Sequence, residues 1–247
     1  MDAMILAAGL GTRLRPLTHE TPKPLIPVGG RAMIDHVAGH LRAAGADRIV
    51  VNTHHLSDQV EAHVKGWEGV EVRISREEPE VLETGGGVLH AAPHFRGDAP
   101  FLVHNSDILS DIPIGEMYAA HQQEGPLATL AVMERETSRY LLFDEDGLFG
   151  WENVDSGEAV RTREPTGKES RLAFTGVHVI SPEFLGLVTE RGAFPIFEPY
   201  LRLARAGHRI TPYRVDGRTW IDIGTHEDLA RARDWMAEGS RSGSASD

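Results

Sequence analysis

Short apolar runs alternate with segments of helical periodicity along the first half of the chain. Runs typical of buried strands occupy Met4–Ala8, Arg48–Thr53, Val70–Ser75, Pro100–Val103 and Leu127–Met133. Between them, helical spacing of apolar residues covers Met33–Ala44, Leu56–Val64, Gly86–Ala92 and Ile114–Glu124. Such alternation requires crossover connections, which make neighbouring strands parallel and place helices on both faces of the sheet. The pattern predicts an α/β fold, a Rossmann-like three-layer sandwich around a mixed, mainly parallel central sheet.

The second half of the chain has a more β-like and less regular pattern. Antiparallel strands are predicted at Tyr140–Phe143, Leu148–Glu152 and Leu172–Ile180, and the polar stretch 155–170 is expected to be a loop. Helices at about Phe194–Ala206 and Thr225–Met236 flank a strand near Arg209–Val215. The Gly/Ser-rich residues 239–247 predict a disordered tail. With neither a linker nor a repeat, we expect one domain over residues 1–238.

Composition narrows the class of partners. The chain has 247 residues, a formal net charge of -12 and no cysteine. An acidic surface repels phosphates at long range, which argues against general binding of nucleic acid or of an anionic membrane. The absence of cysteine excludes disulfides, thiolate catalysis and cysteine-bound metals. No stretch has the length of a membrane span and the N-terminus lacks a signal peptide's basic region, so we expect a cytoplasmic protein.

A glycine loop, Gly9-Leu-Gly-Thr-Arg-Leu-Arg-Pro16, follows the first predicted strand. The carboxyl end of such a strand is where open α/β sheets bind ligands, and glycine N–H groups can cradle phosphates. A dinucleotide fingerprint needs glycine at position 14, which is leucine, and a P-loop needs Gly-Lys-Ser/Thr, where Gly11 is followed by Thr-Arg. Two interpretations remain. One is a phosphate-binding loop with its own cations, Arg13, Arg15 and Lys23; the other is a surface turn with solvated charges.

Two aspartates occupy positions suited to a metal ion. Asp107 follows the apolar run that ends near Val103, and Asp222 lies between apolar residues in Trp220–Thr225. A carboxylate inside an apolar run requires a ligand or hydrogen bonds. Magnesium prefers hard oxygen ligands and keeps several waters, so that two carboxylates suffice. The alternative is that each aspartate caps a turn or bonds local backbone.

These motifs resemble those of a known family. Residues Leu6–Pro16, continuing through Thr18 to Pro22–Pro24, are similar to the signature of the nucleotidyl transferase family, whose members make nucleotide sugars from a nucleoside triphosphate and a sugar 1-phosphate. His104–Asp107 resembles the family's Asn-Gly-Asp motif, with Ser106 where glycine is usual, and Trp220–Thr225 resembles its Trp-x-Asp-x-Gly-Thr element. The resemblance implies a GT-A-like nucleotidyltransferase fold, with a nucleotide-binding half at about residues 1–110 and a sugar-binding half at about 111–238.

The resemblance also implies roles for individual residues. Expected nucleotide-binding residues are Ala7, Ala8, Gly9, Gly11, Thr12, Arg13, Lys23, Thr84 and Gly85. Expected sugar-phosphate residues are Glu83, Asn105, Glu152 and Gly176. Catalysis would fall to Arg13, Lys23 and Asp107, with Mg²⁺ as cofactor held by Asp107 and Asp222.

Two further motifs bear on the substrate. Leu82–Gly87 (Leu-Glu-Thr-Gly-Gly-Gly) resembles short family members that act on N-acetylmuramate 1-phosphate with UTP or on mannose 1-phosphate with GTP. Asn153 stands where many members have a phosphate-binding lysine. The resemblance favours UTP with N-acetylmuramate 1-phosphate, as in peptidoglycan recycling, in a monomer or homodimer. The alternatives are GTP with mannose 1-phosphate, a cytidylyltransferase of alcohol phosphates, and a non-catalytic module that senses nucleotide sugars.

Overall fold

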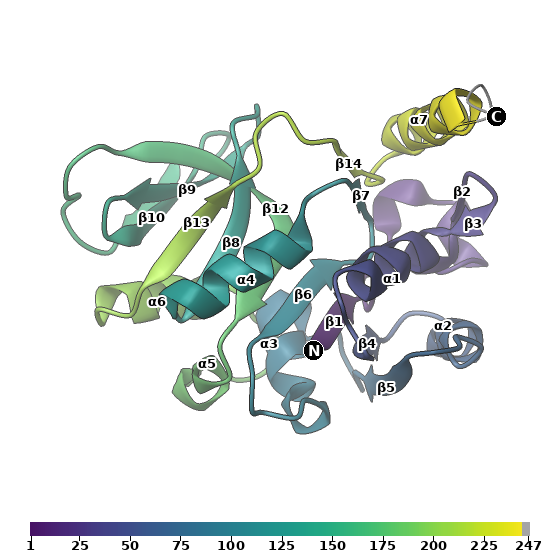
Figure 1. The fold of residues 1–247 in the computed structure, drawn as a ribbon, viewed down its shortest axis with the longest axis horizontal. Helices are drawn as coiled ribbons and strands as arrows, with labels where there is room; N and C mark the ends of the chain where they lie inside the picture. The colour runs from purple at the N-terminus through teal and green to yellow at the C-terminus, as the bar shows by residue number, and fades with distance from the viewer. Residues whose placement is uncertain (244–247) are drawn as a thin grey trace.

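The computed structural model describes residues 1–243, and its central sheet is built from both halves of the chain (Figure 1). The strands are β1 (Asp2–Leu6), β4 (Arg48–Thr53), β5 (Glu71–Arg76), β6 (Phe101–Asn105), β8 (Ala128–Met133), β12 (Ser170–Ile180) and β13 (Ile210–Arg214). Their order is β5-β4-β1-β6-β12-β8-β13, and among these described strands β12 alone runs opposite to the rest. This mixed, mainly parallel sheet confirms the predicted fold class.

Helices cover both faces of the sheet. Alternate residues of β1 face different cores: Ala3 and Ile5 belong to one and Met4 to the other. The first core includes residues of α1 (Met33–Ala43), α2 (Ser57–Val64), α4 (Ile114–Glu124) and α7 (His226–Gly243). The second includes residues of α3 (Glu83–His90), α5 (Glu183–Leu187) and α6 (Phe197–Arg205). Figure 1 shows α1 and α4 across the near face.

Beyond β12 the sheet continues as an antiparallel extension. β9 (Arg139–Asp144) pairs with the first residues of β12, and β10 (Gly147–Asn153) pairs with β9. The prediction of a loop over residues 155–170 was wrong in part, because Glu158–Arg161 forms β11, paired with β10. All four residues of β11 are exposed. An edge strand that buries neither face has no apolar alternation by which the sequence could reveal it.

Several short elements were also not predicted, because two or three residues cannot display a period. β7 (Ile108–Ser110) and β14 (Trp220–Asp222) form an antiparallel ribbon beside the main sheet, and β2 (Pro27–Val28) and β3 (Arg31–Ala32) form another. Single 3-10 turns occupy Thr12–Leu14, Leu17–His19, Lys23–Leu25 and Ala92–His94. The β7–β14 ribbon matters most, since it ties the end of β6 to the C-terminal part of the chain.

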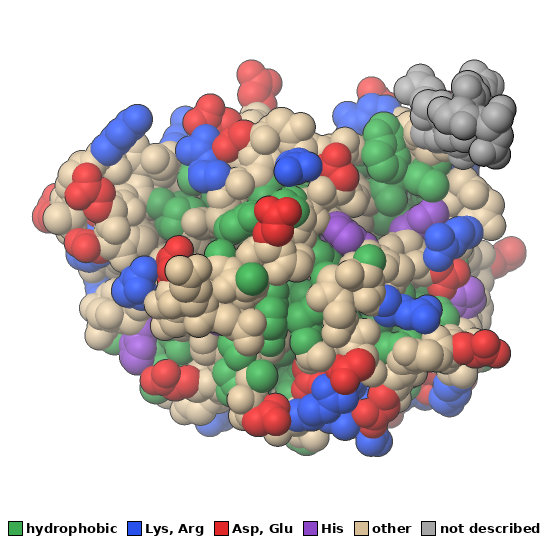
Figure 2. All heavy atoms as spheres, in the orientation of Figure 1, with side chains coloured by type: hydrophobic (Ala, Val, Ile, Leu, Met, Phe, Trp, Pro, Cys, Tyr) green, Lys and Arg blue, Asp and Glu red, His purple; other side chains and the backbone are tan. Residues whose placement is uncertain are grey.

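The C-terminal helix is longer than the sequence pattern suggested. α7 continues to Gly243, whereas a disordered tail was expected from Gly239, and the rest of that tail lies outside the described residues. A glycine inside a helix costs about 1 kcal/mol, which an established helix can absorb. None of the helices in the described part of the chain combines the length and apolar content needed to cross a bilayer. On the face shown in Figure 2, acidic and basic side chains are interspersed around a middle that contains hydrophobic side chains.

Candidate active site

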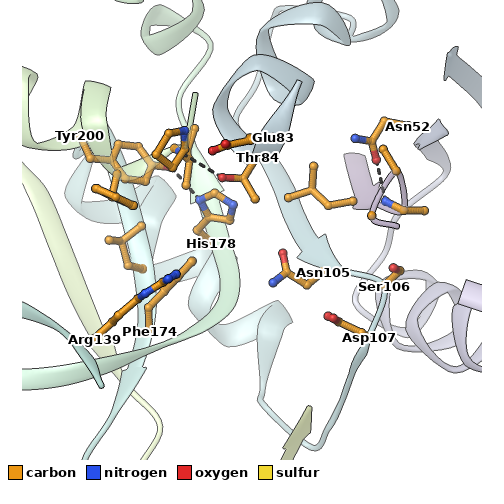
Figure 3. A pocket seen from close by; sticks show the side chains of 18 of the residues that line it. Asn52, Glu83, Thr84, Asn105, Ser106, Asp107, Arg139, Phe174, His178 and Tyr200 are labelled. Carbon is orange, nitrogen blue, oxygen red and sulfur yellow. Dashed lines mark hydrogen bonds between the residues drawn. The ribbon is translucent and has the colours of Figure 1, made fainter. Parts of the chain in front are cut away.

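A cavity of about 560 Å³ lies between the carboxyl ends of β1 and β6 and the antiparallel extension of the sheet (Figure 3). One wall comes from the first half of the chain and includes Ala7, Ala8, Gly9, Lys23, Asn52, Glu83, Thr84, Asn105 and Asp107. The other wall comes from the second half and includes Arg135, Arg139, Tyr140, Trp151, Phe174, His178 and Tyr200. A cavity walled by both halves can hold two substrates side by side.

Asp107, Asp222 and Lys23 meet at one end of the cavity. The β7–β14 ribbon brings the two aspartates together, with the N–H of Ile223 donating to the carbonyl oxygen of Asp107 at 3.0 Å. The Lys23 ammonium, on a buried side chain, forms an ion pair with Asp107 and lies 3.7 Å from Oδ1 of Asp222. The structure thus unites three residues that the sequence had singled out separately.

These carboxylates suit a hard divalent cation. Burial raises the pKa of Asp222, the Asp107 charge raises it further, and Lys23 and Arg13 oppose both. Oδ1 of Asp222 is buried without a hydrogen-bond partner. Within residues 1–243, no group of three or more His, Cys, Asp or Glu side chains has the arrangement of a metal site. Two carboxylate oxygens fit Mg²⁺, which keeps waters and takes its remaining ligands from substrate phosphates.

Arg13 lies beside this centre rather than on the cavity wall. A Cβ added to Gly224 would lie 2.8 Å from Nη2 of Arg13, so the glycine of the Trp-x-Asp-x-Gly-Thr element leaves room for the guanidinium. Gly11 has a φ of +60°, and its carbonyl accepts a hydrogen bond from Thr18 Oγ1 at 2.9 Å. Gly11, Thr12 and Arg13 are not among the residues that line the cavity, whereas Ala7, Ala8 and Gly9 are.

A buried network supports the end of β1. Ala7 N–H donates to Asn52 Oδ1 at 2.6 Å, and Asn52 Nδ2 donates to Glu77 Oε1 at 2.6 Å. The other oxygen of Glu77 accepts the N–H of Leu82 at 2.8 Å. The sequence did not predict this network, although a polar Asn52 inside an apolar strand was a signal that could have revealed it. Because Asn52 already holds the Ala7 N–H, this backbone group is positioned by the protein before any ligand binds.

The start of α3 forms part of the same wall. Glu83 lines the cavity with a φ of +59°, a left-handed conformation that non-glycine residues adopt at a cost. Thr84, which also lines the cavity, accepts the N–H of Ile196 on Oγ1 at 2.9 Å. Gly85 is placed otherwise than expected: it is buried outside the cavity, and a Cβ there would collide with the ring of Phe194. The glycine therefore allows α3 to pack closely.

Some of the residues expected to bind the sugar phosphate line the cavity, and others do not. Asn105 lines the cavity, and Gly176 (φ +81°) lies behind it, where a Cβ would be 2.5 Å from Asn105 Nδ2. Glu152 does not line the cavity, because strand alternation on β10 turns Trp151 inward and Glu152 outward, where Glu152 forms an ion pair with Arg171. Asn153 also lies outside the lining, and its Oδ1 accepts the N–H of Asp155 at 3.1 Å in a turn.

Several other polar groups of the second wall were not predicted from the sequence. His178 Nδ1 and the Tyr200 hydroxyl share a hydrogen bond of 2.6 Å (Figure 3). Burial lowers the pKa of His178 to about 3 and raises that of Tyr200, so this pair is neutral at pH 7. Arg135 and Arg139 bring positive charge to the wall. Isolated arginines in a polar stretch carry no sequence signal for such a position.

Comparisons with known proteins agree with this geometry. A model of the family described as nucleotidyl transferase matches residues 2–239. The chain is 35% identical to the N-acetylmuramate alpha-1-phosphate uridylyltransferase of Caulobacter vibrioides over 245 residues, 96% of this chain and 97% of that protein. It is 31% identical to the mannose-1-phosphate guanylyltransferase catalytic subunit beta of Xenopus tropicalis over 93% of this chain, but spans 62% of that relative.

A solved structure gives the same picture of the fold. The crystal structure of a putative glucose-1-phosphate thymidylyltransferase from Bacillus anthracis, in complex with a sucrose, superimposes with a TM-score of 0.79. The match covers 96% of this chain and 95% of that chain at 21% sequence identity. At that identity the likeness establishes the fold alone.

Proposed function

This chain belongs to the nucleotidyl transferase family, and we propose that it joins a nucleoside triphosphate to a sugar 1-phosphate, giving a nucleotide sugar and pyrophosphate. One observation carries the proposal: Asp107, Asp222 and Lys23 converge at the end of a cavity whose walls come from the two halves of the chain. Phosphate-to-phosphate transfer requires neutralised charge and aligned reactants more than it requires a covalent nucleophile. Paired carboxylates, a buried lysine and a two-walled cavity meet that need.

The proposed reaction is a single in-line displacement. An oxygen of the sugar phosphate attacks the α-phosphorus of the nucleotide, the bond from that phosphorus to the bridging oxygen breaks, and pyrophosphate leaves with the electron pair. Ala7, Ala8 and Gly9 hold the base and ribose through their backbone, and Gly11, Thr12 and Arg13 bind the phosphates. Lys23 stabilises the charge that develops at the reacting centre.

Asp107 and Asp222 are the proposed ligands of Mg²⁺, which when bound would neutralise charge on the reacting phosphates. The buried Oδ1 of Asp222, which has no hydrogen-bond partner, supports this assignment. The sugar phosphate would bind against Glu83 and Asn105, with Gly176 positioning Asn105 from behind. Thr84 would contact the nucleotide while it ties α3 to the segment before α6. Glu152 and Gly85 would act on the ligands indirectly, through strand β10 and through the packing of α3.

We propose UTP and N-acetylmuramate 1-phosphate as substrates. The full-length match to an uridylyltransferase of that sugar supports this choice. The cavity supports it too, because N-acetylmuramate carries a carboxylate on its lactyl group, and Arg139 lines the cavity (Figure 3) with no ion pair among the described residues. Such an enzyme would act in the cytoplasm on sugars recovered from the cell wall. GTP with mannose 1-phosphate is the second candidate, favoured by the partial match to a guanylyltransferase.

A substrate matrix tests the proposal. UTP, GTP, CTP and dTTP are each combined with N-acetylmuramate, mannose and glucose 1-phosphates and Mg²⁺, and pyrophosphate release is measured. The proposal expects the highest kcat/KM for UTP with N-acetylmuramate 1-phosphate. Preference for GTP with mannose 1-phosphate would select the second candidate, and no release from any pair would indicate a non-catalytic module.

A further inference from the structure

Arg135 is a partly buried arginine on the wall of the cavity. The chain has 37 acidic and 25 basic residues, and arginines such as Arg48, Arg96 and Arg202 are ion-paired. Arg135 belongs to no ion pair among the described residues. Its contacts are the carbonyls of Glu136 (3.3 Å from Nη1) and Phe174 (3.2 Å from Nη2), while its Nε is buried without a partner. A partly buried cation left in this state is stabilised if an anion joins it.

The guanidinium is held in place by the ribbon that carries Asp222. Its carbon lies 4.0 Å from the centroid of the Trp220 ring. The Trp220 indole is fixed in turn, because its Nε1–H donates to the carbonyl of Thr175 at 2.8 Å. Trp220 and Asp222 lie on the same strand, β14, so one short strand positions both a proposed metal ligand and this arginine.

Arg135 also lies within electrostatic reach of the proposed centre. It lines the same cavity as Lys23 and Asp107, and the Asp222 carboxylate acts on it electrostatically. Lys23 and Arg13 approach from the first half of the chain. The planar fork of an arginine matches the oxygens of a phosphate, and stacking on an aromatic ring fixes the plane of that fork.

Arg171 is a second arginine stacked on an aromatic ring, and its contacts suit a purely structural role. The guanidinium carbon of Arg171 lies 3.9 Å from the centroid of the Tyr140 ring, much as Arg135 lies on Trp220. Arg171 does not line the cavity, however, and its charge is balanced by Glu152. Arg135 also stacks on a ring, that of Trp220, but it has no ion-paired carboxylate and it lines the cavity.

Building on the proposed function, we infer that Arg135 binds the phosphate of the incoming sugar phosphate and holds it against the α-phosphate of the nucleotide. Arg135 thus supplies a phosphate contact from the loop between β8 and β9, while Asn153 on β10 makes a turn. The interaction is charge-assisted and two-pronged, so its loss should weaken binding of the acceptor by about 10- to 100-fold. Binding of the nucleotide, which contacts the other wall, should be unaffected.

The test compares Arg135→Gln with the matched control Arg171→Gln in steady-state kinetics. The expected result for Arg135→Gln is a 10- to 100-fold higher KM for the sugar 1-phosphate, a KM for the triphosphate within twofold of wild type, and an unchanged inhibition constant for the same sugar without phosphate. Arg171→Gln should match wild type in all three. An unchanged acceptor KM, or equal losses for the triphosphate and the neutral sugar, would overturn the inference in favour of a structural role.

A second variant covers the case in which Arg135→Gln does not fold. Arg135→Lys keeps the charge but loses the fork, and should raise the acceptor KM three- to tenfold with the triphosphate KM unchanged. No change, or equal change in both, would refute the inference. Failure of the proposed function is a separate outcome, since the wild-type enzyme would then release no pyrophosphate from any substrate pair.

Discussion

Asp107 and Asp222 come from opposite halves of the chain, and a single main-chain hydrogen bond, from the N–H of Ile223 to the carbonyl of Asp107 at 3.0 Å, sets them side by side. The ribbon that contains this bond also places Asp222 opposite Ile108. Lys23 then contacts both carboxylates, although it pairs directly with Asp107 and lies farther from Asp222. This asymmetry leads to different expectations for the two aspartates.

Asp222→Asn should remove activity without loss of stability. We expect kcat to fall at least about 100-fold, because a proposed metal ligand is lost. The free energy of unfolding should stay equal or rise, since the amide removes a buried charge that has no hydrogen-bond partner at Oδ1 and lies near a like charge. Asp107→Asn should lose both activity and about 1–3 kcal/mol of stability, because it leaves the buried Lys23 without its direct partner. Turnover assays and urea unfolding measure the two effects.

Asp111→Asn is the matched control for this pair. Asp111 accepts the N–H of Thr219 at 2.7 Å, next to the same ribbon, and does not line the cavity. An asparagine can still accept that bond through its side-chain oxygen, so activity and stability should both remain near wild type. A comparable loss of turnover in Asp111→Asn would mean that the ribbon tolerates no change of charge, and the metal assignment would lose its support.

The left-handed backbone of Glu83 predicts that glycine is at least as stable as alanine at this position, the reverse of the usual order in helices. At an ordinary helix position, alanine is more stable than glycine by about 1 kcal/mol. At position 83, with φ at +59°, alanine keeps the strain and glycine relieves it. Glu83→Gly should therefore be at least as stable as Glu83→Ala in urea unfolding. The exposed Gln123 of α4 provides the reference, where Gln123→Ala should exceed Gln123→Gly by the usual margin. The same ordering at both positions would contradict strain at Glu83.

Arg139 should decide between acidic and neutral acceptors. Arg139 lines the cavity (Figure 3) without an ion pair among the described residues, and a guanidinium is suited to the lactyl carboxylate of N-acetylmuramate. Arg139→Gln should lower kcat/KM for N-acetylmuramate 1-phosphate about tenfold, and leave that for N-acetylglucosamine 1-phosphate within twofold. Equal effects on both acceptors would remove Arg139 from sugar recognition and leave it as a general source of positive charge.

Buried neutral histidines should make the fold sensitive to mild acid. Burial lowers the pKa of His121 to about 4, against about 6.5 for an exposed histidine. Between pH 6.5 and pH 4, His121 therefore binds a proton in the unfolded chain but not in the native state. The stability that is present above pH 6.5 is lost as the pH falls toward 4. Between pH 7 and pH 5 this histidine should cost about 2 kcal/mol.

His121→Gln isolates that contribution, because His121 bonds Thr129 and Ser181 and does not line the cavity. Urea unfolding at pH 7 and pH 5 should show a drop in stability about 2 kcal/mol smaller in the variant than in the wild type. An identical drop in both proteins would show that His121 titrates normally in the native state.

The fold and half of the candidate site could be predicted because their signals are local. Each parallel strand is a short apolar run, and Asp107 follows such a run, so its place at the carboxyl edge of the sheet follows from the strand alone. The family motif implies a sugar contact for Glu152, whereas the alternation along β10 puts Trp151 on the cavity wall and leaves Glu152 out of it.

The rest depends on contacts between distant segments. Asn52 and Glu77 form one network because β4 and β5 pair in parallel, a register that neither strand specifies by itself. Gly85 and Gly176 are glycines because of Phe194 and Asn105, which come near only in the folded chain. The surroundings of Arg135, with a stacked Trp220 ring and no ion-paired carboxylate, likewise form only in the folded chain.

The central claim is that the cavity joins two phosphates in one displacement, and ³¹P NMR of the wild-type enzyme tests it most directly. With UTP, N-acetylmuramate 1-phosphate and Mg²⁺, the resonances of both substrates should be replaced by a diphosphate pair and by pyrophosphate in equal amounts. The change should need both substrates and should be absent in Asp222→Asn. Release of inorganic phosphate from UTP alone, or unchanged spectra with every sugar 1-phosphate, would contradict the account.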